Sequence, residues 1–191
     1  MGRDRQGESS VLCPTTSFHL HLFKNDTMNT ELLIKMITDS WRKQITATNK
    51  IFDNLSDEEL GHEVAPGRNR GIYLLGHLTA VHDRMLPLLR FEESKYPELK
   101  PLFLDSPDKA VEAIPSAHQL RQQWKEVNEA LLNHIQTLPA EDWFTRHANI
   151  SEEDFIKEPH RNRLNVLLDR TIHLSNHRGQ LLLLKKGISR H

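Results

Sequence analysis

The sequence predicts an all-α protein, a four-helix bundle with long, partly helical connections. Apolar residues recur at three- and four-residue steps in four segments of about 20 residues each, as they do on one side of an amphipathic helix. No segment shows the strict alternation, or the richness in valine, isoleucine and threonine, that is typical of strands. Most of the prolines lie between these segments, where they do not interrupt a helix.

The composition limits the classes of protein to which the chain can belong. Its 191 residues suit one globular domain, and a net charge of -1 offers no basic surface for a nucleic acid. No apolar run reaches the roughly 18 residues of a membrane span. The only cysteine, Cys13, excludes an intrachain disulfide and a thiolate-rich zinc site. We therefore expect a soluble, cytoplasmic protein with no nucleic-acid or membrane partner, in which imidazole or carboxylate would bind any metal.

The first 27 residues differ from the rest of the chain. They lack a helical period and contain Pro14, so we predict that residues 1–27 are a disordered leader. A signal peptide is disfavoured because the apolar part is interrupted and no small-residue cleavage site follows it. The alternative is that translation starts at Met28 and that the leader is a gene-model extension. The predicted domain is 28–191 in either case.

The first two helices are predicted from their apolar periods. The first covers about residues 30–53, and its inward positions are Leu33, Met36, Ile37, Ile45, Thr48 and Phe52. Ser56 and Glu59 have the spacing of a capping box, which predicts a short helical turn after it. The second helix covers about residues 71–90, and one side of it carries Leu74, His77, Leu78, Val81, Met85 and Leu88.

The second half of the chain contains the other two helices. Residues 91–115 include four prolines, so this connection should hold only short helical pieces, with 108–114 ("DKAVEAI") as a candidate. Ser116 and Gln119 form another capping-box pattern, which opens a third helix that runs to about Thr137. The fourth helix is predicted over residues 163–186, and we expect it to be apolar on nearly every side and deeply packed.

Two histidines in the last helix, in "TIHLSNHRGQ", raise the question of a metal site. His173 and His177 are four residues apart, so both imidazoles project from one side of the helix. With 12 histidines in the chain, this spacing alone can be a coincidence. The same side is otherwise apolar, and a buried histidine without a partner is costly. His77 occupies a core-facing position on the second helix, so packing of the two helices would bring three neutral imidazoles together and leave a metal an open position.

Neighbouring residues add further expectations. His82 is rotated by about 140° from His77, so we predict that it is a surface or rim residue. Gly76 and Gly179 lie inside helices, where glycine costs about 1 kcal/mol relative to alanine, and they predict close helix contact beside the site. Arg178 points away from the site and is expected to have a structural or interface role. Candidates for the pocket wall or for hydrogen bonding to the ligands, with solvated surface residues as the alternative, are Asp169, Arg170 and Gln180.

Other catalytic patterns fit poorly. A zinc-protease helix requires a glutamate between its two histidines, and none of the residues between His173 and His177 is acidic. Paired Glu-x-x-His motifs, typical of di-iron bundles, are represented only by Glu59 and His62, in a predicted connection. The sequence contains no glycine-rich phosphate loop and no G-x-S-x-G motif.

Two motifs, "LLGHL" at 74–78 and "HLSNHRGQLLLL" at 173–184, resemble the DinB family, also called the DinB/YfiT-like family of metal-dependent enzymes. The resemblance covers residues 28–187. It implies a four-helix bundle that binds one divalent metal ion through His77, His173 and His177. Zinc or nickel is the expected ion, with iron or manganese as alternatives. Because family members are often dimers, it also implies a homodimer.

The resemblance also implies a function. Characterised relatives are similar to S-transferases and isomerases that use a low-molecular-weight thiol such as bacillithiol, mycothiol or glutathione. Our first hypothesis is a metal-dependent transferase that moves such a thiol onto a small electrophilic substrate, with the metal binding sulfur as thiolate. The alternatives are a hydrolase that uses metal-bound hydroxide and a non-catalytic metal-binding, stress-response protein.

Overall fold

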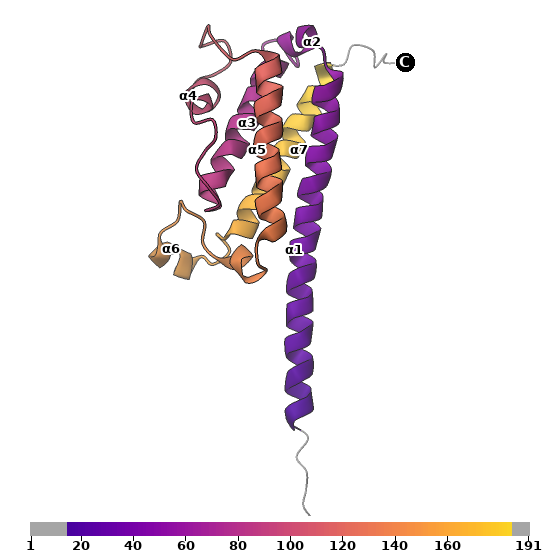
Figure 1. Ribbon diagram of the computed structural model, residues 1–191, viewed down its shortest axis with the longest axis vertical. Helices are drawn as coiled ribbons and strands as arrows, with labels where there is room; N and C mark the ends of the chain where they lie inside the picture. The colour runs from indigo at the N-terminus through magenta and orange to yellow at the C-terminus, as the bar shows by residue number, and fades with distance from the viewer. Residues whose placement is uncertain (1–14, 185–191) are drawn as a thin grey trace, which may run out of the picture.

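The computed structural model describes residues 15–184, with side chains from residue 28 onward. Four long helices form a bundle: α1 (Thr15–Asn54), α3 (Gly71–Leu88), α5 (Ala117–Thr137) and α7 (Arg163–Leu181) (Figure 1). Short helices lie in the connections: α2 (Asp57–Gly61), α4 (Leu99–Phe103), α6 (Glu152–Lys157), and 3-10 helices at Glu141–Phe144 and Leu182–Leu184. Residues 15–184 contain no strand, so the predicted all-α bundle is confirmed.

The four helices enclose one core. α1 packs along α7 and α3 packs along α5, whereas the contact between α3 and α7 is sparser. α3 and α7 run antiparallel, because Gly71 at the start of α3 lies against Leu184 just after the end of α7 (Figure 1). All four helices contribute fully buried side chains, among them Trp41, Leu74, Leu78, Leu131 and Leu174. No helix within residues 15–184 is long and apolar enough to span a bilayer.

The predicted boundaries are accurate where capping residues mark them. Ser56 and Ser116 each accept a hydrogen bond from the backbone N–H three residues later and complete a capping box. α7 begins at Arg163 as predicted but ends at Leu181, earlier than expected. The predicted last residues of this helix, 185–186, lie outside the described residues.

The predicted start of the first helix is wrong. α1 begins at Thr15 and not near residue 30, so the helix enters the segment predicted as a leader. Residues 1–14 lie outside the described residues, and the domain boundary at Met28 stays a prediction. Leu33 and Met36 were expected to face the core, yet they are 45% and 59% exposed. Ile37, also predicted to face the core, does pack against it, and Ile34 packs there in place of Leu33 and Met36, because the contact with the bundle follows a neighbouring side of the helix.

The fourth helix is not packed on every side, contrary to the prediction. Leu168, Ile172 and Leu183, the last just after the end of α7, are 38%, 61% and 65% exposed, whereas Leu167 and Leu174 are fully buried. The reason is geometric, since α7 packs against α1 and α3 and its remaining side faces outward. In the sequence, the apolar residues on that side could not be distinguished from core residues.

The connection between α3 and α5 is helical at a different place from the one predicted. Residues 108–114 are not helical, and the helical piece is α4. The carboxylate of Asp108 accepts hydrogen bonds from the backbone N–H of Arg70, at 2.7 Å, and from its guanidinium, at 2.6 Å. Lys109 has a φ of 69°, in the left-handed region, which a helix does not permit. This ion pair therefore holds the connection in an irregular conformation over the start of α3.

Close packing of α4, and not of α7, leaves no room for a side chain at Gly76. A Cβ atom at this position would lie 2.4 Å from the ring of Phe103, which is fully buried. The predicted close contact at Gly76 is therefore real, but its partner is the connection. The same prediction for Gly179 is wrong, because nothing lies within 4 Å of a Cβ atom placed there.

The two glycines form a matched pair for a stability test. We expect Gly76→Ala to destabilise the protein by about 1–3 kcal/mol, because the added methyl group must displace the Phe103 ring. Gly179→Ala should stabilise it by up to about 1 kcal/mol, because alanine favours the helix and meets no neighbour. Urea denaturation of both variants measures these changes, and a Gly76→Ala protein as stable as the wild type would contradict the packing described here.

Candidate metal centre

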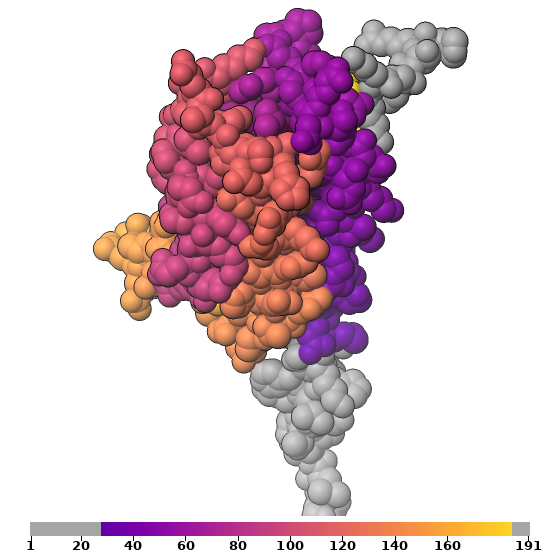
Figure 2. All heavy atoms as spheres, turned by 45° about the horizontal axis from the view of Figure 1, so that its top comes forward, coloured from indigo at the N-terminus to yellow at the C-terminus, as the bar shows by residue number. Residues whose placement is uncertain are grey.

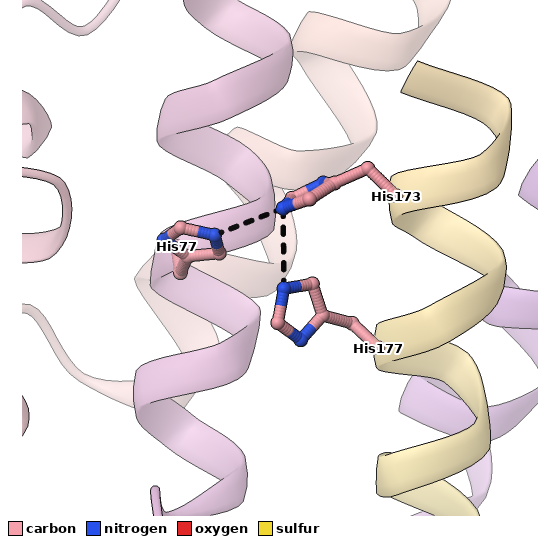
Figure 3. A group of neighbouring side chains, drawn as sticks. All are labelled: His77, His173 and His177. Carbon is pink, nitrogen blue, oxygen red and sulfur yellow. Dashed lines mark hydrogen bonds between the residues drawn. The ribbon is translucent and has the colours of Figure 1, made fainter. Parts of the chain in front are cut away.

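Three histidines from two helices point toward one another between α3 and α7 (Figure 3). His77 projects from α3, and His173 and His177 project from successive turns of α7. The Nε2 atom of His173 lies 3.3 Å from that of His77 and 3.2 Å from that of His177. The structure thus brings together the three histidines that the sequence singled out.

Hydrogen bonds at the far side of two rings determine which nitrogen carries the proton. Nδ1 of His77 lies 2.9 Å from the carbonyl oxygen of Phe103, which can only accept, so this Nδ1 is the protonated nitrogen. Nδ1 of His177 lies 3.0 Å from Oε1 of Gln180 and donates in the same way. The lone pairs of both Nε2 atoms therefore face the centre. Gln180 is thus a neighbour of a histidine, as expected.

With these tautomers, the three histidines have too few N–H protons to hydrogen-bond to one another. His77 and His177 both present lone pairs to Nε2 of His173, which in a neutral ring can offer at most one proton for two acceptors. If His173 donates from Nε2, its buried Nδ1 becomes an acceptor, and Nδ1 has no hydrogen-bond partner among the described residues. A cation bound by the three Nε2 atoms would remove this conflict. The residues therefore fit a divalent metal ion.

The surroundings keep the imidazoles of His77 and His173 neutral. Burial, followed by the effects of the neighbouring His177 and His77 and of Arg170, lowers the pKa of His173 to about 4. The pKa of His77 is lowered mainly by burial, against the raising effect of its bond to Phe103. Because neutral imidazole is the form that binds metals, the centre is prepared for a metal near neutral pH.

The other polar candidates occupy different places. Arg170 is half-buried on α7, and its charge lowers the pKa of His77 and His173, so it lies near the centre. Asp169 is exposed and forms no hydrogen bond or ion pair with any residue in the described part of the chain. Arg178 is half-buried, with an Nε atom that lacks a partner there, and its role stays a prediction.

His82 is not a surface residue, contrary to the prediction. Its side chain is completely buried, and its ring lies 4.8 Å from both Trp41 and Trp124. Its Nδ1 donates a hydrogen bond of 2.8 Å to Oδ1 of Asn128, and burial lowers its pKa to about 3. The prediction failed because it assumed that α3 has one inner side. α3 contacts both α5 and α7, so positions far apart around the helix both face the interior.

Two features of the centre had no signal in the sequence. The acceptor for His77 is a backbone carbonyl in a connection, and a backbone atom leaves no mark on residue type. A cavity of about 520 Å³ is lined by Arg170, which the sequence offered as a candidate for a pocket wall, but its other walls, formed partly by irregular connections, had no such signal. A second cavity, of about 650 Å³, lies between α1 and α5, which are side by side in Figure 2, and none of the three histidines lines it.

Comparisons with known proteins agree with this architecture. The model of a protein family described as the DinB superfamily matches residues 40–181. A crystal structure of a DinB-like protein from Bacillus cereus ATCC 10987 is similar to this chain, with 25% sequence identity and a TM-score of 0.56. The match covers 78% of this chain and 87% of the other. No curated protein matches the chain.

Proposed function

The chain belongs to the DinB superfamily, and from this premise we propose that His77, His173 and His177 hold one divalent metal ion at a catalytic centre. The main support is the convergence of three Nε2 atoms that have too few protons to satisfy one another. Imidazole ligands suit zinc or nickel, which we propose first, and also iron or manganese.

The chain's own residues would prepare the centre for the metal. The carbonyl of Phe103 and the amide of Gln180 orient two of the rings and keep their Nε2 atoms unprotonated. Burial keeps His77 and His173 neutral at the pH of the cell. When bound, a divalent ion with three neutral ligands lowers the pKa of a thiol or water molecule that it binds.

We propose a transferase that uses a low-molecular-weight thiol and a small electrophilic substrate in the cytoplasm, where such thiols are kept reduced. The test is an assay of the zinc-loaded protein with glutathione, bacillithiol or mycothiol and a generic alkylating substrate. We expect turnover with at least one thiol and a loss of about 100-fold or more in His177→Ala, because one of three metal ligands is removed. Absence of turnover with all three thiols would refute the transferase.

The same assay distinguishes the two alternatives. Turnover of an activated ester without added thiol would indicate a hydrolase that uses metal-bound hydroxide. Metal binding without either reaction would indicate a non-catalytic protein in which the ion only ties α3 to α7.

We also propose that the protein is a homodimer. Four large apolar side chains on α1 are 45% to 61% exposed, and a second copy of the chain would cover them: Met28, Leu32, Leu33 and Met36. We expect sedimentation equilibrium to give a dimer for the wild type and a monomer for the double variant Leu32→Glu/Met36→Glu. Ile156→Glu, a change at an exposed apolar residue of α6, is the control and should remain dimeric. A monomeric wild type would refute the proposal.

A further inference from the structure

A cavity of about 520 Å³ is lined by residues of α3, of α7 and of two connections. Its walls include Val81 and Arg84 of α3 and Arg170 of α7. Val81 and Arg84 follow His77 by four and seven residues, and Arg170 precedes His173 by three, so each lies on the same side of its helix as a histidine of the centre. Because the two helices are antiparallel, these positions are on the same side of the centre along the groove. The cavity therefore lies within about two helical turns of the histidines, although none of them lines it.

Two arginines on the walls of the cavity have no acidic partner. Arg84 and Arg170 form no hydrogen bond or ion pair with any residue in the described part of the chain, although other arginines, such as Arg70 and Arg121, do. Arg170 is half-buried, and its charge acts on His77 and His173. The one acidic residue on the walls is Glu93, which is exposed. Two guanidinium groups without acidic partners thus face a space of a size suited to a small molecule.

We propose that this cavity binds the anionic group of a small-molecule ligand, a carboxylate or a phosphate, through Arg84 and Arg170. Guanidinium groups present planar pairs of N–H donors that match both kinds of anion. Apolar parts of the wall, such as Val81 and Leu104, would contact the carbon skeleton of the ligand. The orientation of its reactive end toward the histidines rests on the proposed function, whereas anion binding does not.

The experiment measures binding of succinate and of inorganic phosphate by calorimetry, with succinamide as the uncharged counterpart of succinate. Each titration uses the zinc-loaded wild type and the His177→Ala variant freed of metal. We expect one of the two anions to bind to both proteins, which distinguishes a carboxylate site from a phosphate site. If the carboxylate is preferred, succinamide should bind at least about tenfold more weakly than succinate.

Variants of the two arginines test the assignment of the site. Arg84→Gln and Arg170→Gln should each weaken anion binding by about tenfold, and Arg170→Lys should weaken it less because the charge is kept. Arg68→Gln is the matched control, because Arg68 is exposed and does not line the cavity, and it should leave binding unchanged. Arg84 is exposed on α3, so its variant remains informative if Arg170→Gln does not fold.

Three results would overturn the inference. They are the absence of binding by either anion, binding that neither arginine variant weakens, and binding that requires zinc and is indifferent to the arginines, which would place the anion on the metal. A wild type that binds the anion but no metal would refute the proposed function and leave this inference standing.

Discussion

Removal of the metal should lower the melting temperature of the zinc-loaded protein by about 8–16 °C. An ion held by the three histidines would bind only when α3 and α7 are packed, so its binding free energy would add to the stability of the folded chain. Zinc at about 1,000 times its dissociation constant adds about 4 kcal/mol. In a protein of this size each kcal/mol corresponds to about 2–4 °C.

Differential scanning calorimetry with and without a chelator measures this shift. His177→Ala is the matched variant, and its melting temperature should be independent of zinc because two imidazoles remain. His118→Ala, at an exposed residue away from the centre, should behave as the wild type does. Equal shifts in His177→Ala and the wild type would place the stabilising metal elsewhere.

Acid should destabilise the metal-free protein strongly, and His82 should account for much of the effect. Its pKa is about 3 in the folded protein and about 6.5 in the unfolded chain. The unfolded state therefore binds a proton that the folded state excludes, so stability is full above pH 6.5 and falls as the pH decreases toward 3. By pH 4 the loss from this residue alone is about 3 kcal/mol.

The variant His82→Gln isolates this contribution, because glutamine can keep a hydrogen bond to Asn128 but does not titrate. Urea denaturation with a chelator present should show the wild type more stable at pH 7 and the difference reduced, or reversed, at pH 4. His173 titrates in the same direction in both proteins, so its effect cancels in the comparison. An identical pH dependence in the two proteins would show that His82 is not buried and neutral.

The sequence predicted the parts of the fold that depend on local signals. Periodic apolar residues and the capping residues Ser56 and Ser116 gave the helices and several of their ends, because these signals act within a few residues of the chain. Which side of a helix is covered depends on its neighbours. The exposure of Leu33 and the burial of His82 could not be predicted for that reason.

The candidate metal centre, too, was predicted only where local helical geometry determines it. Spacing on α7 paired His173 with His177, and a core-facing position on α3 indicated His77, since helical geometry is the same in every protein. The carbonyl of Phe103 and the cavity beside Arg170 depend on irregular connections, whose course is determined by contacts such as the ion pair between Arg70 and Asp108. No residue pattern encodes that course.

Elemental analysis of the purified wild type beside His177→Ala tests the metal centre most directly. We expect about one divalent ion per chain in the wild type and in the control His118→Ala, and far less in His177→Ala, because two imidazoles hold an ion much more weakly than three. Equal metal content in the wild type and His177→Ala would contradict the assignment of the three histidines as its ligands.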